Sequence, residues 1–102
     1  MSTIKVSNNY PRTSSFHGDV VRASKNELTK VLGYPTDGTD DIDEKTQNEW
    51  QVETEDGTCG YIYDWKEYRR YSDSARIGWH IGAENPADSH KIKVALQTAL
   101  AK

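Results

Sequence analysis

A strict alternation of residue types that ends at a turn dipeptide constrains this chain more than any other feature of its sequence. Large or branched side chains alternate with polar ones along the run Gln47-Asn-Glu-Trp-Gln-Val-Glu-Thr54. A period of two is typical of a strand that buries one face. The dipeptide Asp56-Gly57 follows, and it is the strongest short signal for a tight hairpin. The pattern therefore predicts an antiparallel hairpin whose second strand runs from Cys59 to Trp65.

The same alternation lets us assign faces to the strands. On the returning strand we expect the larger side chains and the single cysteine to point inward, which places Ile62 and Asp64 on the outward face, with Asp64 at the surface. A third strand is predicted over Arg76–Ile81, where Ile77, Trp79 and Ile81 alternate with smaller or polar residues. Trp50 and Trp79 are expected in the core, because a small domain poor in Leu and Ile needs large side chains to fill it. The inward residues of the returning strand are Cys59, Tyr61, Tyr63 and Trp65.

Two helices are predicted from their capping signals. Ser24 and Glu27 have the spacing of a capping box, and Gly33 can end the helix, so we expect a helix over residues 25–32. Asn85 is a suitable N-cap and Pro86 suits the first helical position. They predict a C-terminal amphipathic helix whose apolar residues recur at steps of three and four: Ile92, Ala95, Leu96, Ala99 and Leu100.

These elements predict a single small α+β domain over residues 16–102, preceded by a polar N-terminal arm or short edge strand over residues 1–15. We expect an antiparallel three- to four-stranded sheet, with its first strand at Phe16–Ala23 and the short helix and the C-terminal amphipathic helix on one face. Residues 34–44 are expected to form a loop. The 102 residues are 34% hydrophobic and contain one cysteine, and no apolar run approaches the roughly 18 residues of a membrane helix. With no secretory signal at the N-terminus, we expect the protein in the reducing cytoplasm.

Charge is distributed unevenly along the chain. Residues 37–56 carry a net charge of -8, whereas the whole chain carries -3, so the other residues sum to +5. Two interpretations compete: a solvated acidic loop, or an acidic surface that engages a basic groove on another protein, with the long-range field steering the encounter. The spacing of the acids does not match a calcium-binding loop. Under the second interpretation the partner-binding residues of this loop are Asp40, Asp41, Asp43 and Glu44.

A mixed aromatic and basic stretch follows the hairpin and offers a second candidate surface. Trp65, Lys66, Arg69 and Arg70 suit protein hot spots, and we take them as partner-binding candidates. Arginine and aromatic planes equally suit the phosphate and base of a nucleotide. A solvated loop at the sheet edge is the third reading. The alternative ligand-binding set is Tyr63, Trp65, Lys66, Arg69, Arg70 and Arg76.

The sequence gives little support to catalysis or to metal binding. It contains no P-loop, dinucleotide-binding glycine pattern, nucleophile elbow or metalloprotease motif. Asp64 and His80 on neighbouring strands form the one acid/base pair to consider. The three histidines lie far apart in the sequence, and none has a Cys/His ligand spacing. We therefore expect a protein that is not an enzyme and that holds no metal and no cofactor.

Three segments together resemble a family of short bacteriophage and large-virus proteins. They are Trp50-Gln-Val-Glu-Thr-Glu-Asp-Gly57, Tyr61-Ile-Tyr-Asp-Trp-Lys66 and Trp79-His-Ile-Gly82. The corresponding family motifs are W-x-I-E-x-x-D-G, I-Y-D-W-K and W-H-I-G-G, and this chain has Ala83 in place of the last glycine. The likeness covers roughly residues 44–85. It implies a viral accessory protein and transfers no catalytic or binding residue.

Three functional hypotheses follow. The first is a phage-encoded protein that binds and inhibits a host defence protein with a basic surface, such as a CRISPR–Cas or other nuclease effector, inside the infected host cell. The second is a sponge that sequesters a nucleotide immune signal, and the third is an oligomeric structural or regulatory viral protein. None of them needs a membrane partner, and the net charge of -3 disfavours direct nucleic-acid binding.

Overall fold

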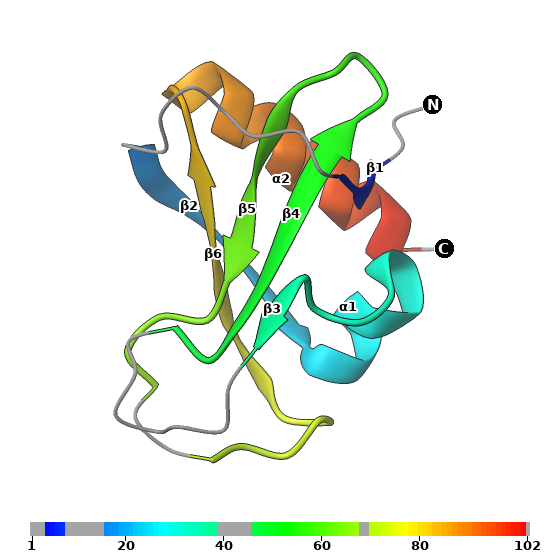
Figure 1. Cartoon of the computed structure of the whole chain (residues 1–102), viewed down its shortest axis with the longest axis vertical. Helices are drawn as coiled ribbons and strands as arrows, with labels where there is room; N and C mark the ends of the chain where they lie inside the picture. The colour runs from blue at the N-terminus through cyan, green and yellow to red at the C-terminus, as the bar shows by residue number, and fades with distance from the viewer. Residues whose placement is uncertain (1–3, 8–15, 39–45, 68–69, 102) are drawn as a thin grey trace.

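The computed structural model describes residues 4–7, 16–38, 46–67 and 70–101, which form an antiparallel sheet with two helices (Figure 1). The strands of the sheet run in the order β1-β4-β5-β6-β2, and the two-residue strand β3 pairs with β4. The sheet lies in front in Figure 1, and α2 passes behind it. The elements are β1 (Ile4–Val6), β2 (Phe16–Ser24), α1 (Lys25–Leu32), β3 (Asp37–Gly38), β4 (Asn48–Thr54), β5 (Cys59–Tyr63), β6 (Arg76–Ala83) and α2 (Pro86–Leu100).

Both helices begin where their sequence signals place them, and α1 also ends at its predicted residue. At the start of α1 the backbone N–H of Glu27 donates to Ser24 Oγ over 3.1 Å, and the backbone N–H of Ser24 donates to Glu27 Oε1 over 3.0 Å. Gly33 then takes a positive φ of 84° that other residues rarely adopt, and this ends the helix. At the start of α2 the side chain of Asn85 accepts the backbone N–H of Asp88 over 2.9 Å. The two predicted helices are confirmed.

The core lies between the helices and one face of the sheet, around two tryptophans. Trp50 and Trp79 are both fully buried, and their rings meet edge to face with centroids 5.3 Å apart. Each indole N–H also has a backbone acceptor, Gly33 O at 3.0 Å for Trp50 and Ala23 O at 2.9 Å for Trp79. Buried indoles need such partners, because an unpaired N–H in the core is costly. The prediction that both tryptophans belong to the core is confirmed.

The α+β class and the antiparallel sheet are confirmed, but the sheet is wider than the predicted three or four strands. Ile4–Val6 forms an edge strand paired with β4, and the side chain of Ile4 is 8% exposed within the core. These residues of the expected N-terminal arm therefore belong to the sheet. Asp37–Gly38, within the expected loop, pairs with the start of β4. Ile4–Val6 thus forms the short edge strand that was one of the two alternatives for the N-terminus, whereas the two-residue strand β3 is too short to leave a periodic pattern in the sequence and was missed.

The predicted faces of the returning strand are wrong. Trp50 pairs with Ile62, and Ile62 pairs with Ile81, so these three side chains share the face that the helices cover. Asp64 lies on that face too and is 1% exposed, which corrects its expected surface position. Cys59 lies on the opposite face and is only half-buried, so it does not pack inward. Side-chain size could not decide between two faces that both carry large residues; pairing with the neighbouring strands decides it.

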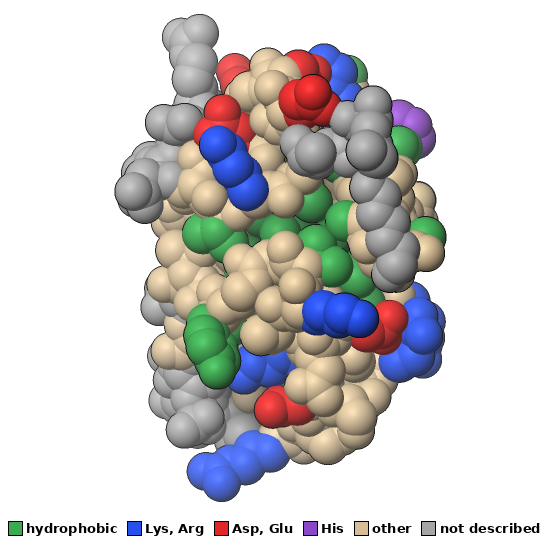
Figure 2. Space-filling model, turned by 90° about the vertical axis from the view of Figure 1, so that its right-hand side faces the viewer, with side chains coloured by type: hydrophobic (Ala, Val, Ile, Leu, Met, Phe, Trp, Pro, Cys, Tyr) green, Lys and Arg blue, Asp and Glu red, His purple; other side chains and the backbone are tan. Residues whose placement is uncertain are grey.

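Within the described residues, none of the helices is both long and apolar enough to cross a membrane. Figure 2 shows the side of the molecule that lies to the right in Figure 1, where α1, β1 and the end of α2 are found. Hydrophobic side chains gather near the middle of this side, and charged side chains lie above and below them.

Candidate functional site

The face of the sheet opposite the helices carries a cluster of aromatic side chains. Glu49 of β4 pairs with Tyr63 of β5, and Tyr63 pairs with His80 of β6, so these three form one row across the sheet. Trp65 lies two residues beyond the end of β5 and is 40% exposed, whereas the other two tryptophans are fully buried. We call this surface, which no helix of the described residues covers, the open face.

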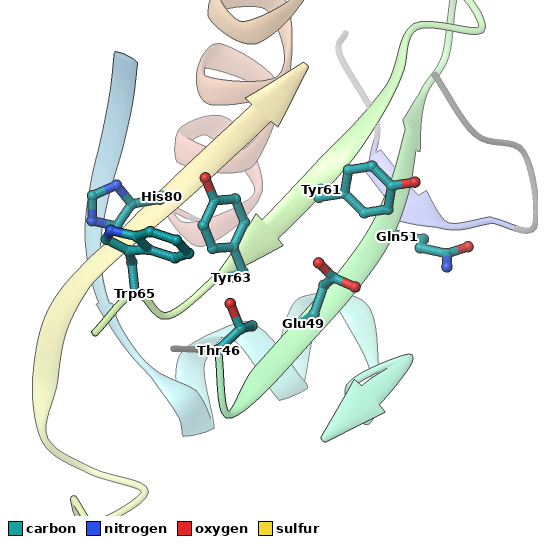
Figure 3. Close-up of a pocket in the computed structure, with 7 residues that line it drawn as sticks. All are labelled: Thr46, Glu49, Gln51, Tyr61, Tyr63, Trp65 and His80. Carbon is teal, nitrogen blue, oxygen red and sulfur yellow. The ribbon is translucent and has the colours of Figure 1, made fainter. Parts of the chain in front are cut away.

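A hollow of about 580 Å³ lies on the open face. Its volume falls within the range of roughly 300–1,000 Å³ that is usual for ligand sites. Figure 3 shows Trp65 and His80 on one side of Tyr63, with Glu49 and Tyr61 on the other. The side chains that line the hollow are Thr46, Glu49, Gln51, Tyr61, Tyr63, Trp65 and His80.

The rings of the hollow are held against one another. The Tyr63 ring stacks on His80 with centroids 5.8 Å apart and an interplanar angle of 24°. Trp65 meets Tyr63 edge to face at 6.0 Å, and the Lys66 ammonium lies 5.5 Å from the centroid of the Trp65 ring. Burial raises the pKa of the Tyr63 phenol, and the negative charge of Glu49 raises it further. Tyr63 therefore lines the hollow as an uncharged phenol, with the carboxylate of Glu49 beside it.

Backbone conformation at the end of β5 sets the position of Trp65. Lys66 adopts a φ of 54°, the left-handed region that residues other than glycine, asparagine and aspartate rarely enter. This conformation turns the chain directly after Trp65. Strain of this kind persists only where the surrounding structure enforces it, and it is common beside functional sites.

The buried carboxylate of Asp64 anchors the neighbouring residue on the other side of the sheet. It accepts the backbone N–H of Gln47 over 2.7 Å and that of Asn48 over 2.9 Å. It also accepts the O–H of Tyr71, and burial together with this bond raises the pKa of the Tyr71 phenol. Asp64 thus ties the start of β4, next to Thr46 and Glu49, to the end of β5 next to Trp65.

The structure brings together only some of the residues predicted as a site. Tyr63 and Trp65 line the hollow and Lys66 covers the Trp65 ring, while Arg70 is exposed outside the lining. Arg76 lies elsewhere: its Nη2 donates to the Arg22 carbonyl over 3.2 Å, and its Nη1 is 3.7 Å from Glu27 Oε1. Five predicted residues lie outside the described part of the chain: Asp40, Asp41, Asp43, Glu44 and Arg69.

Sequence reasoning missed most of the lining. Glu49 and Gln51 are predicted only as the polar alternates of their strand, and His80 only as an alternate and as a partner of Asp64, yet all three line the hollow because they do not face the core. The alternation of side chains along each strand was the sequence signal that could have placed these residues opposite the core. Asp64 and His80, considered as an acid/base pair, lie on opposite faces of the sheet, so they cannot share a proton. Among the described residues, no three His, Cys, Asp or Glu side chains group closely enough to hold a metal ion.

A second hollow lies where the β4–β5 hairpin meets α2. Lys91 Nζ is 3.3 Å from Asp56 Oδ2 there, and both side chains are more than half exposed. The hydroxyls of Thr54 and Thr58 hold the pKa of Asp56 far below its ordinary value, the Thr54 bond having the larger effect. These contacts are explained by their role in fixing the hairpin turn. The open face is therefore the stronger candidate for a binding site.

Comparison with protein-family models and with curated proteins finds no match to this chain. The candidate site is therefore assigned from its geometry alone.

Proposed function

We propose that the protein acts by binding a protein partner through its open face, as a small phage-encoded inhibitor of a host defence protein. The observation that carries this proposal is the ring-lined hollow with Trp65 at its rim, 40% exposed on a face that no described helix covers. Tryptophan and tyrosine are the residues most enriched at the energetic centres of protein interfaces. The place of action that follows is the cytoplasm of the infected cell.

The charge distribution supports a partner with a basic surface. Residues 37–56 carry a net charge of -8, and Glu49 and Glu53 of that segment lie on the open face. A nuclease effector presents a basic groove to nucleic acid, and an acidic partner is drawn to such a groove by the same field. The motif resemblance to phage and large-virus proteins supports a viral accessory role.

The test is protection of infecting phage in cells that carry a defence system. Expression of the protein should raise the plaque count on bacteria armed with the CRISPR–Cas or nuclease system that it inhibits. Trp65→Ala should abolish that gain without changing the melting temperature, because its side chain is exposed. Tyr34→Ala is the matched control, since Tyr34 is an 86% exposed aromatic outside the hollow. Equal loss with both variants, or full protection by Trp65→Ala, contradicts the proposal.

A second candidate function is sequestration of a nucleotide immune signal. The volume of the hollow and its rings support it, with Tyr63 and Trp65 stacking on a base and Lys66 or Arg70 meeting phosphate. Calorimetry with a panel of cyclic nucleotides tests this function. Heat on mixing that disappears in Trp65→Ala supports it, whereas the absence of heat with every member excludes it for that panel.

A further inference from the structure

The lining of the hollow combines ring faces with a carboxylate. Tyr61, Tyr63 and Trp65 supply aromatic rings, and Glu49 extends from β4 between the tyrosines (Figure 3). The face of an aromatic ring carries partial negative charge, so rings gathered around a carboxylate favour a cation. The charge of Glu49 is felt inside the hollow, because it contributes to the raised pKa of Tyr63.

The molecule already contains one such contact. The Lys66 ammonium lies over the Trp65 ring, 5.5 Å from its centroid, at the rim of the hollow. Trp65 therefore suits a cation on its ring, and a cation from a partner takes the place of the Lys66 ammonium there. An anionic ligand entering the same space meets the carboxylate of Glu49, and this repulsion weighs against a nucleotide phosphate deep in the hollow.

We propose that the hollow receives an arginine side chain of the partner protein. The planar guanidinium stacks on the ring of Trp65, which stands at 81° to the ring of Tyr63, and its fork of N–H donors binds the carboxylate of Glu49. A lysine ammonium has no plane to stack and cannot form the two parallel hydrogen bonds. This inference rests on the proposed function, because arginine is abundant in grooves that bind nucleic acid.

The indole N–H resonances of the full-length protein provide the assay. The N–H groups of Trp50 and Trp79 are bonded inside the core, so they serve as internal controls for that of Trp65. Titration with the capped peptide Gly-Arg-Gly should shift the Trp65 resonance and leave the other two in place. The same peptide with citrulline, which keeps the shape and loses the charge, should bind about tenfold more weakly.

Two charge variants locate the contact. Glu49→Gln should weaken the arginine peptide about tenfold, because a charge-assisted pair is lost. Glu53→Gln is the matched control: it removes the same charge from the same face of β4, at a position paired with Cys59 and outside the hollow. It should leave the affinity within about twofold, since Glu53 lies four residues along β4 from Glu49, about 13 Å at the rise of a strand, and charges farther apart than a Debye length are largely screened. Preserved core indole resonances confirm that each variant is folded.

Distinct outcomes overturn this proposal. Equal binding of the arginine and citrulline peptides excludes recognition of the charge, and equal loss with both glutamate variants excludes Glu49 as the contact. Binding of adenosine monophosphate that tightens in Glu49→Gln identifies the hollow as a nucleotide site. If the peptide fails to bind while Trp65→Ala still abolishes phage protection, the arginine inference fails and the proposed function stands. If the peptide binds but the protein gives no phage protection, the arginine inference stands and the proposed function fails.

Discussion

Removal of the buried carboxylate of Asp64 is the sharpest test of how this fold is held together. Asp64 is 1% exposed, and it accepts the backbone N–H groups of Gln47 and Asn48 and the hydroxyl of Tyr71. In Asp64→Ala both backbone donors lose their partner near the core. A buried donor left without an acceptor costs about 1–3 kcal/mol, so the two together cost about 4 kcal/mol. That is a large share of the roughly 5–15 kcal/mol by which a small domain is stable.

Asp64→Asn separates the hydrogen bonds from the charge. The amide oxygen can still accept both backbone N–H groups, but the Tyr71 hydroxyl, which already accepts from Asn48 Nδ2 over 2.8 Å, loses its carboxylate acceptor, so we expect a loss of about 1–2 kcal/mol. Urea unfolding, followed by tryptophan fluorescence, measures each free energy of unfolding. If Asp64→Ala proves as stable as Asp64→Asn, the backbone bonds do not carry the stability and the reasoning fails. If Asp64→Ala does not fold, the free energies of unfolding of Asp64→Asn and Tyr71→Phe can still be compared. Their difference reports on the contact of the Tyr71 hydroxyl with residue 64.

Three further predictions concern the backbone of the sheet and its turns. Gly60→Ala should destabilise the fold by about 1–3 kcal/mol in urea unfolding, because the added Cβ would lie 2.4 Å from Ile92 Cδ1 and 2.6 Å from the Gly82 carbonyl oxygen; unchanged stability would show that the strand and α2 separate freely. Lys66→Gly should have a free energy of unfolding up to about 1 kcal/mol higher than that of Lys66→Ala, because only glycine enters the left-handed region without strain. Equal free energies of unfolding would mean that the backbone at Lys66 is unstrained. Asp56→Asn should be less stable than the natural chain at pH 7, and the difference should shrink progressively as the pH falls below about 4, because the lowered pKa of Asp56 stabilises the fold only while the carboxylate is charged in the folded state. A difference that stays constant between about pH 7 and pH 2 in thermal melts would refute the assignment.

The sequence predicts those parts of the fold whose signals are local. Capping residues such as Ser24 and Asn85 act within one helical turn, so both helices could be read directly from the chain. The alternation around Trp50 likewise reports a strand. Which face of a strand is buried is a different kind of fact, because it depends on what the neighbouring strands place beside it. The register that joins Ile62 to Trp50 and Ile81 therefore reversed the predicted faces of β5.

In the candidate site, too, local features could be predicted from the sequence, whereas contacts across the sheet could not. Trp65 and Lys66 were identified because cations and aromatic rings are adjacent in the sequence, and they do meet in the structure. Glu49 and His80 lie 31 positions apart, and only the pairing of β4, β5 and β6 brings them into one row. Arg76 was grouped with the site by sequence proximity, but its guanidinium binds near α1 instead. Sequence distance is a poor guide to distance across a sheet.

The three consecutive residues Tyr63, Asp64 and Trp65, at the end of β5 and directly after it, contribute to both stability and binding. Tyr63 and Trp65 point to the open face, while Asp64 between them points to the core. Because Asp64 is bonded to the start of β4, the strand that carries Glu49, the spacing between the carboxylate and the rings is fixed by contacts on the opposite side of the sheet. The hollow is thus preorganised, which lowers the conformational entropy that a partner must overcome on binding. Substitutions of Trp65 should change affinity alone, whereas substitutions of Asp64 should change both affinity and stability.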